Sequence, residues 1–138
     1  MTVTKWEALD TVLSSEANEI APDGSPVRVL ARLDRGSMGH FTTPAGQTIR
    51  AVCHKTVDEL WFVISGHGEM WRSDGTESSI TPFAPGHSLA IPVGTIFQVR
   101  NVGQEDICVL GQTMPAWPDN SEATIEQGIW TPTMVSND

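Results

Sequence analysis

Turn-forming residues divide this chain at short, regular intervals, and this is the feature that most limits how it can fold. Proline, glycine and aspartate cluster at 22–25, 34–36, 44–46 and 73–76, and Asp-Gly at 74–75 is a favoured hairpin connection. The segments between them are β-branched or apolar and recur about every 8 to 12 residues. Expected strands cover 27–33, 39–44, 48–54, 59–65 and 68–72, with later ones beginning near 78, 87, 96 and 106. This pattern predicts an all-β sandwich or barrel.

Length and charge limit the domain count and the partners. The chain has 138 residues, of which 39% are hydrophobic, which is enough for one packed core and too short for two. Its formal net charge of −9 would repel phosphate backbones and anionic membranes. We therefore expect one domain over residues 1–138 that binds neither nucleic acid nor membranes.

The two ends depart from the strand pattern. Residues 4–20 have a helical spacing of Trp6, Leu9 and Leu13 and are predicted to form a short helix or an arm. The proline-rich tail, 114–138, is predicted to be an irregular segment wrapped over the barrel and anchored by Trp117 and Trp130.

The cysteines and the chain start suggest a cellular setting. Cys53 and Cys108 lie far apart and form no CxxC pair, so neither a disulfide framework nor a cysteine-rich zinc site is predicted. The first residues lack a basic region followed by an apolar stretch, and no apolar run is long enough to span a membrane. We expect a reduced, cytoplasmic protein.

A spaced pattern of glycines and polar residues runs from Gly46 to Gly66. Five residues follow Gly46, then come the triplet 52–54 (Val-Cys-His), four residues, Glu59, six residues and Gly66. Glycines at such positions serve strand corners, where the backbone adopts conformations that other residues avoid.

A second pattern begins at Gly86. Five residues follow it, then Pro92, one residue, Gly94, two residues, Phe97, three residues and Asn101. In this order and register, the two patterns resemble the two motifs of the cupin family. Two of the family's ligand histidines are absent here, because Val52 and Phe97 stand at their positions.

The resemblance implies a double-stranded β-helix, or jelly-roll barrel, with its motif core at 46–101. It also implies a small-molecule ligand inside the barrel and a homodimer, which exposed strand edges would favour. The N-terminal segment is a candidate contact between the subunits.

The family's four metal-ligand positions correspond here to Val52, His54, Glu59 and Phe97. Alternate residues of a strand share a face, so Arg50 is expected to point the same way as His54, and Trp61 the same way as Glu59. The expected site is therefore a polar pair in a largely apolar cup, with Cys53 pointing away from it.

Metal binding is one interpretation of this site. A catalytic zinc or iron centre normally has three protein ligands and an open position, and His54 and Glu59 supply two. His40, on the preceding strand, is the first candidate for the third, while His67 and His87 are more distant possibilities. The cofactor is therefore either a divalent transition metal or none.

Two further interpretations need no metal. An imidazole beside a carboxyl, partly desolvated near Trp61 and Phe97, would have a shifted pKa and could move protons as an isomerase or lyase does. The alternative to such chemistry is that His54 and Glu59 only satisfy each other's hydrogen bonds, as the relic of an older site. In the second interpretation, the same cup would bind or sense a small, mostly apolar ligand without catalysis. Trp61 and Phe97 would then pack on the ligand, and His54, Glu59 and Arg50 would orient it. We favour a small-molecule enzyme of unknown substrate.

Overall fold

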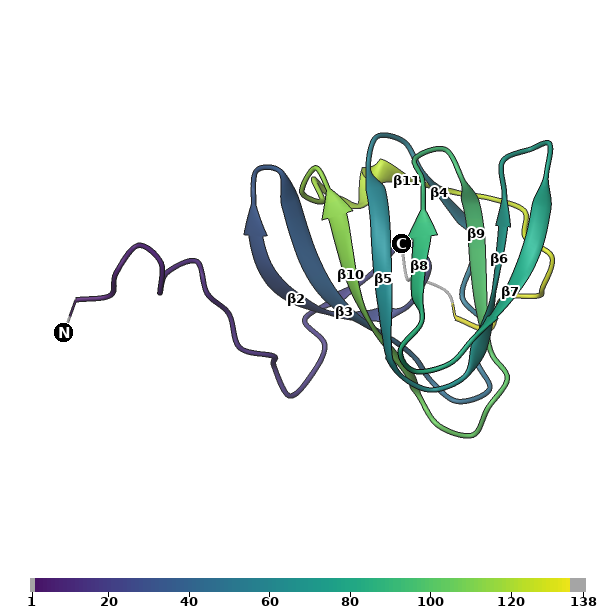
Figure 1. Cartoon of the computed structure of the whole chain (residues 1–138), viewed down its shortest axis with the longest axis horizontal. Coiled ribbons are helices and arrows are strands. Elements are labelled where there is room, and N and C mark those ends of the chain that lie inside the picture. Colours follow the sequence, from purple (N-terminus) through teal and green to yellow (C-terminus); the bar gives the residue numbers. More distant parts are fainter. Residues whose placement is uncertain (1, 135–138) are drawn as a thin grey trace.

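The computed structural model describes residues 2–134, and its regular structure consists of β-strands and one short 3-10 turn (Figure 1). One sheet contains, in spatial order, β1 (Glu19–Ile20), β2 (Pro26–Leu33), β3 (Gly36–Thr43), β10 (Ile107–Met114), β5 (Asp58–Ser65) and β8 (Ser88–Ile91). The other contains β11 (Ala123–Ile125), β4 (Val52–His54), β9 (Ile96–Asn101), β6 (Gly68–Ser73) and β7 (Ser78–Phe83). The named strands pair antiparallel, and the predicted all-β fold is confirmed.

The core lies between the two sheets, and β5 shows how the sequence builds it. Its residues alternate, so that Glu59, Trp61 and Val63 are buried while the residues between them are exposed. This is the two-residue period of a strand with one face inward. The buried apolar cluster consists of Ile49, Val52, Trp61, Val63, Met70, Phe83, Leu89, Ile91, Phe97, Val99, Ile107 and Val109.

The glycines of the two motifs hold the corners between strands. Gly46, Gly66, Gly86 and Gly94 all have positive φ, a region that other residues rarely adopt. At Gly66 a side chain is excluded for a second reason besides the positive φ, because a Cβ there would lie 2.6 Å from the Asp106 carbonyl oxygen. These backbone requirements keep the strand register whether or not the pocket retains metal ligands.

The strand expected at 48–54 is shorter than predicted. β4 begins only at Val52, and Thr48 forms an isolated bridge with Arg100. Ile49 and Val52 both belong to the buried core cluster although they are three residues apart, so the alternation of faces is broken just before β4.

The N-terminal segment is an arm and not a helix. Thr4 and Glu7 exchange hydrogen bonds between side chain and backbone, as in a capping box, and only a turn follows. Trp6 and Leu9 stay exposed, and so short a helix is not stable without a face that packs. Figure 1 shows the arm projecting away from the barrel.

The C-terminal tail is more regular than expected. It contains the 3-10 turn η1 (Asn120–Glu122) and β11, which pairs with β4. Trp130 lies under the guanidinium of Arg100, 4.5 Å from ring centroid to Cζ, and the buried Gln98 side chain bonds the backbone of Ile129 and Trp130. Residues 135–138 of this tail lie outside the described residues.

The part of the chain that the structure describes contains no helix long and apolar enough to cross a membrane.

Candidate functional site

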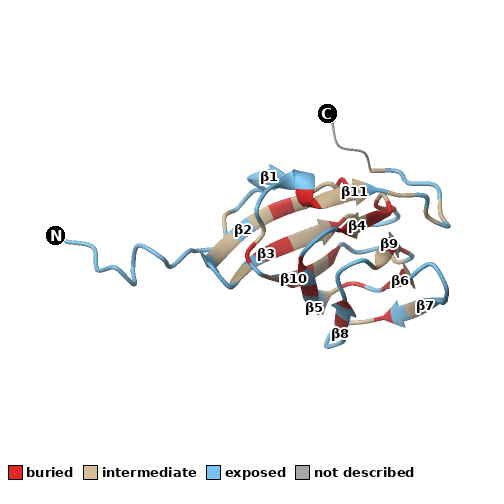
Figure 2. Cartoon of the chain, turned by 90° about the horizontal axis from the view of Figure 1, so that it is seen from above, coloured by how far each residue is buried: buried red, intermediate tan, exposed pale blue. Residues whose placement is uncertain are grey.

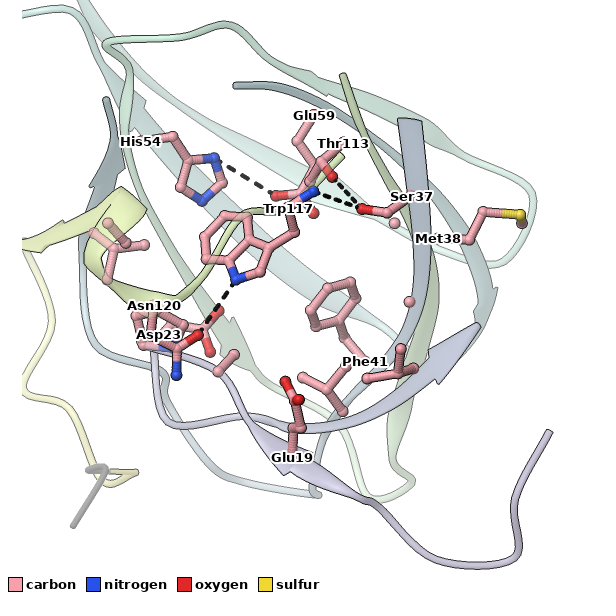
Figure 3. Close-up of a pocket in the computed structure, with 18 of the residues that line it drawn as sticks. Glu19, Asp23, Ser37, Met38, Phe41, His54, Glu59, Thr113, Trp117 and Asn120 are labelled. Carbon is pink, nitrogen blue, oxygen red and sulfur yellow. Dashed lines mark hydrogen bonds and ion pairs between the residues drawn. The ribbon is translucent and has the colours of Figure 1, made fainter. Parts of the chain in front are cut away.

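A pocket of about 510 Å³ opens between the two sheets at the end where η1 and β1 lie. Figure 3 shows His54 and Glu59 facing each other across its floor, with Trp117 in front of them. Val52, Trp61 and Phe97 also line it. The pocket volume falls within the range of about 300–1,000 Å³ that small-molecule sites usually have.

Three strands place the five central side chains. Val52 pairs directly with Phe97 across β4 and β9, so that the two apolar residues at ligand positions lie side by side. His54 follows at the end of β4, two residues after Val52 and therefore on the same face. Glu59 and Trp61 project from β5 in the opposite sheet.

The polar pair is buried and incompletely bonded. His54 is 5% exposed and Glu59 is 4% exposed, with 3.9 Å between Nδ1 of the imidazole and Oε1 of the carboxyl. That separation is too long for a hydrogen bond. Within the described residues, neither His54 Nδ1 nor Trp61 Nε1 has a hydrogen-bond partner, although both are buried. Such atoms normally find a partner, so two of them beside one pocket mark a place for a ligand.

Burial keeps both groups uncharged at neutral pH. It raises the pKa of Glu59 to about 8, assisted by the nearby Asp23 carboxyl and opposed by the Trp61 indole, which lies close but not in hydrogen-bonding geometry. Burial also lowers the pKa of His54 to about 4, against the attraction of Glu122. The pair is therefore a carboxylic acid facing a neutral imidazole, and not an ion pair.

Aromatic rings form the walls around this pair. The His54 ring meets Phe97 and Trp117 edge to face, with centroids 5.3 and 5.2 Å apart. Trp61 contacts Phe97 and stacks on Phe41, each at 6.0 Å. Rings at these distances pack favourably and exclude water from the acid and the base between them.

A segment that we call the strap, residues 115–123, crosses the mouth of the pocket. Trp117 donates its backbone N–H to Ser37 Oγ at 2.9 Å and its indole N–H to Asn120 Oδ1 at 3.3 Å. Ser37 is in turn bonded to Thr113, 2.6 Å between hydroxyl oxygens, which ties the strap to β3 and β10. These bonds are drawn in Figure 3 and hold Trp117 against His54.

Glu122 fixes the link between the two site residues. This buried carboxylate accepts hydrogen bonds from the Thr56 N–H and hydroxyl and from the Val57 N–H. Thr56 and Val57 lie between His54 and Glu59 in the chain. Burial alone would raise the pKa of Glu122, but these hydrogen bonds outweigh it and the pKa is lowered.

Two predicted site residues do not reach the pocket. Arg50 is not among its lining residues, because the break in alternation before β4 turns it elsewhere. His40 lies on the outer face of β3, since its neighbours Gly39 and Phe41 line the pocket and His40 does not. Burial and Arg28 lower the His40 pKa.

The donor set does not fit a metal centre. Across the described residues, no group of three or more His, Cys, Asp or Glu side chains could hold an ion. Of the distant candidates, His87 is exposed and its Nδ1 accepts the Ala84 N–H, while His67 is exposed at a turn. Phe97 occupies the place of a ligand histidine, so we derive no chemistry through a metal.

Several residues that line the pocket were not predicted from the sequence as site residues. Asp23, Ser37, Thr113 and Asn120 line the pocket from segments outside the motif core. Asp23 had been interpreted only as part of a turn, yet it is buried and accepts from the Ser25 backbone and hydroxyl. Trp117 was predicted as an anchor of the tail, and its contact with His54 could not be foreseen without the path of the chain.

The two antiparallel sheets and the pocket between them define a double-stranded β-helix barrel with an interior pocket. The chain belongs to the cupin family, whose domain model matches residues 39–111. A search of curated protein sequences found no relative that matches.

Solved structures support the same fold. An uncharacterized conserved protein with a double-stranded beta-helix domain from Klebsiella pneumoniae is 16% identical, covering 93% of this chain and 99% of its own, with a TM-score of 0.64. KdgF from Halomonas sp. is 16% identical over 76% of this chain and 93% of its own, at 0.63. Oxalate decarboxylase from Bacillus subtilis is 16% identical over 77% of this chain and 28% of its own, at 0.64. At such identities the likeness shows the fold alone.

Proposed function

We propose that this cupin is a metal-independent enzyme that moves protons on a small molecule, with Glu59 as the acid and His54 as the base. The observation that carries the proposal is the buried pair itself: two titratable groups with oppositely shifted pKa values face one pocket without bonding each other. Groups whose pKa values are pushed apart by their surroundings are typical of acid–base sites.

The chemistry follows from the protonation states. The neutral His54 imidazole accepts a proton from a carbon next to a carbonyl group, and Glu59 donates its acid proton to the carbonyl oxygen. The substrate becomes a neutral enol, while the protein briefly holds an imidazolium and a carboxylate. With a hydroxyketone the enol is an enediol. His54 then returns its proton to the former carbonyl carbon, and the neighbouring hydroxyl gives its proton to Glu59, so the carbonyl moves by one carbon with no net change in protons.

The names of the structural neighbours do not supply a substrate. Oxalate decarboxylase and KdgF share the fold at 16% identity, and neither name is carried over to this pocket. What supports proton transfer here is the geometry of His54 and Glu59 and the aromatic shell that keeps water from them.

Deuterium exchange tests the proposal without knowledge of the product. In D₂O, a panel of cyclic hydroxyketones is incubated with the protein, and NMR follows deuterium incorporation next to the carbonyl. We expect the wild type to accelerate exchange and His54→Gln to lower that rate by about 100-fold or more. His87→Gln, which changes an exposed histidine outside the pocket, is the matched control and should exchange at the wild-type rate.

A compound that binds in the pocket but exchanges no faster than in buffer would contradict catalysis. The non-catalytic binding role would then be the better description of the same site.

A further inference from the structure

We propose that this pocket selects an uncharged molecule bearing a hydroxyl or carbonyl oxygen and rejects carboxylates and phosphates. The inference concerns the ligand of the proposed site and rests on the proposed function only for the location of that site. It is carried by the charges and the unbonded polar atoms that line the pocket.

The first step is the balance of charge around the pocket. Among the described lining residues, four carry carboxyl groups, and Glu59 and Asp23 are the buried two. Within residues 2–134, the one guanidinium that lines the pocket belongs to Arg32, which is exposed and donates from Nη1 to the Trp117 carbonyl oxygen. The described wall of the pocket therefore offers an anion no buried cation.

The second step is what an anionic ligand would meet. A carboxylate or phosphate loses its hydration on entering an aromatic-walled pocket, and this loss is offset only if a positive group pairs with it. Of the two buried carboxyl groups that line the pocket, Glu59 is uncharged at neutral pH and offers an anion a hydrogen-bond donor but no positive charge. The neutral His54 imidazole offers no positive charge in exchange.

The third step is what an uncharged ligand would gain. The Trp61 Nε1–H is a donor, and an imidazole nitrogen is an acceptor when it carries no proton. Trp61 Nε1 and His54 Nδ1 are buried without partners in the part of the chain described. A hydroxyl group both donates and accepts, so an uncharged ligand oxygen can bond to either kind of group that the protein leaves unbonded.

An ammonium ligand is the remaining alternative, since it would pair with carboxylates and pack on aromatic rings. Burial keeps the Glu59 carboxyl in its acid form below about pH 8, so at neutral pH it presents a proton donor to the ligand. A protonated carboxyl donates to a carbonyl or hydroxyl oxygen, but it offers an ammonium group no negative charge to offset the loss of hydration.

Three probes of the same shape separate these cases: benzyl alcohol, benzylamine and benzoate. Each is titrated at pH 7 into ¹⁵N-labelled protein, and the Trp61 indole signal, assigned with Trp61→Phe, reports binding in the pocket. We expect benzyl alcohol to bind with a Kd at least tenfold below those of benzylamine and benzoate. Its Kd should rise as the pH passes 8 in the wild type but not in Glu59→Gln, whose amide keeps a donor.

Benzoate binding as tightly as benzyl alcohol would overturn the inference, as would tightest binding of benzylamine or no response to any probe. Asp34→Asn, outside the pocket, should reproduce the wild-type order of affinities. Because this readout is binding, it is independent of the exchange assay. Selective binding of benzyl alcohol, together with no accelerated exchange of any hydroxyketone in the panel, would contradict catalysis while supporting the ligand class.

Discussion

Glu59 and His54 show how two ordinary side chains acquire unusual properties from position alone. Both are nearly inaccessible to solvent, and burial disfavours the charged form of each. The pKa of Glu59 therefore rises to about 8 and that of His54 falls to about 4, so neither group is charged near neutral pH. Gly111 makes room for the arrangement, because a Cβ there would lie 2.9 Å from Glu59 Oε2 and 2.5 Å from the Phe41 ring.

The shifted pKa of Glu59 predicts a pH-dependent stability. The unfolded chain releases this proton near the ordinary value of 4.5, whereas the folded protein holds it to about 8. The free energy of unfolding contributed by Glu59 is thus fully present below pH 4.5 and is lost as the pH rises through 8. The slope is about 1.4 kcal/mol per pH unit.

His54 acts in the opposite direction and in a different window. Its pKa falls from 6.5 to about 4 on folding, so its contribution is present above pH 6.5 and lost as the pH falls through 4. Between pH 6.5 and 8 only Glu59 of the pair changes stability. Chemical denaturation should show the wild type losing about 2 kcal/mol relative to Glu59→Gln over this interval.

The exposed Glu77→Gln serves as the control, and its stability should follow the wild-type curve. Parallel curves for the wild type and Glu59→Gln would show that Glu59 ionises normally in the folded protein.

At the scale of elements, the strap and the Glu122 carboxylate within it set the geometry of the site. η1 is only one turn long and carries little stability of its own, so its position depends on side-chain bonds. Glu122 provides them by binding Thr56 and Val57, the link from β4 to β5. The strap thereby couples the cover of the pocket to the spacing between His54 and Glu59.

Glu122→Ala should therefore destabilise the protein by about 2–4 kcal/mol, because it leaves two backbone N–H groups without their acceptor. Denaturant unfolding measures the loss. Glu126→Ala, which removes a carboxylate bonded only to the Thr124 hydroxyl, should cost less than about 1 kcal/mol. Equal effects of the two substitutions would argue against a special role for Glu122.

At the scale of the whole molecule, the outer face of the larger sheet exposes apolar side chains that nothing in a single chain covers in the described residues. Leu60, Phe62 and Ile64, which we call the outer stripe, are 49%, 50% and 45% exposed along β5. A strand that is apolar on both faces is typical of one covered on both sides. Phe62 pairs with Leu110 on β10, and Leu60 with Ala90 on β8, so these cross-strand neighbours of the stripe are also uncharged.

The N-terminal arm also exposes large apolar side chains to solvent. Trp6 is 66% exposed and Val12 is 91% exposed, and Figure 2 shows the arm as exposed along its length. In a chain with a net charge of −9, two copies can approach closely only through faces that carry few carboxylates. The outer stripe meets this condition, whereas the arm also carries Glu7, Asp10, Glu16 and Glu19. The homodimer expected from the sequence stays a prediction, with the outer stripe as its proposed contact and the apolar side chains of the arm as a second candidate.

Light scattering after size exclusion tests the dimer. We expect the wild type to have about twice the 15.0 kDa mass of one chain at micromolar concentrations. Phe62→Glu should shift it to the single-chain mass, because a buried, unpaired charge opposes association. Val93→Glu alters an equally exposed apolar residue away from the stripe and should leave the dimer intact. A wild type with the mass of one chain would refute the proposal.

Most of the fold was predictable because it depends on local rules. Turn glycines with positive φ and alternating apolar residues placed β2, β5, β6 and β9 within a few residues of their observed bounds. The arm's helical spacing misled in part, because Trp6 and Leu9 have the right period but nothing to pack against. A period predicts which residues share a face, and only a packing partner makes the element stable.

The sequence by itself determined the cupin barrel, the corners of its motifs and the presence of His54, Glu59, Val52 and Phe97 in one pocket, because strand period and register fix which side chains converge. Only the tertiary structure decided that Arg50 and His40 lie elsewhere, and that Asp23, Trp117 and Glu122 complete the site. These residues come from segments far apart in the chain, where no local pattern specifies contact. The neutral state of the acid and base is also tertiary, since it results from burial by the whole barrel.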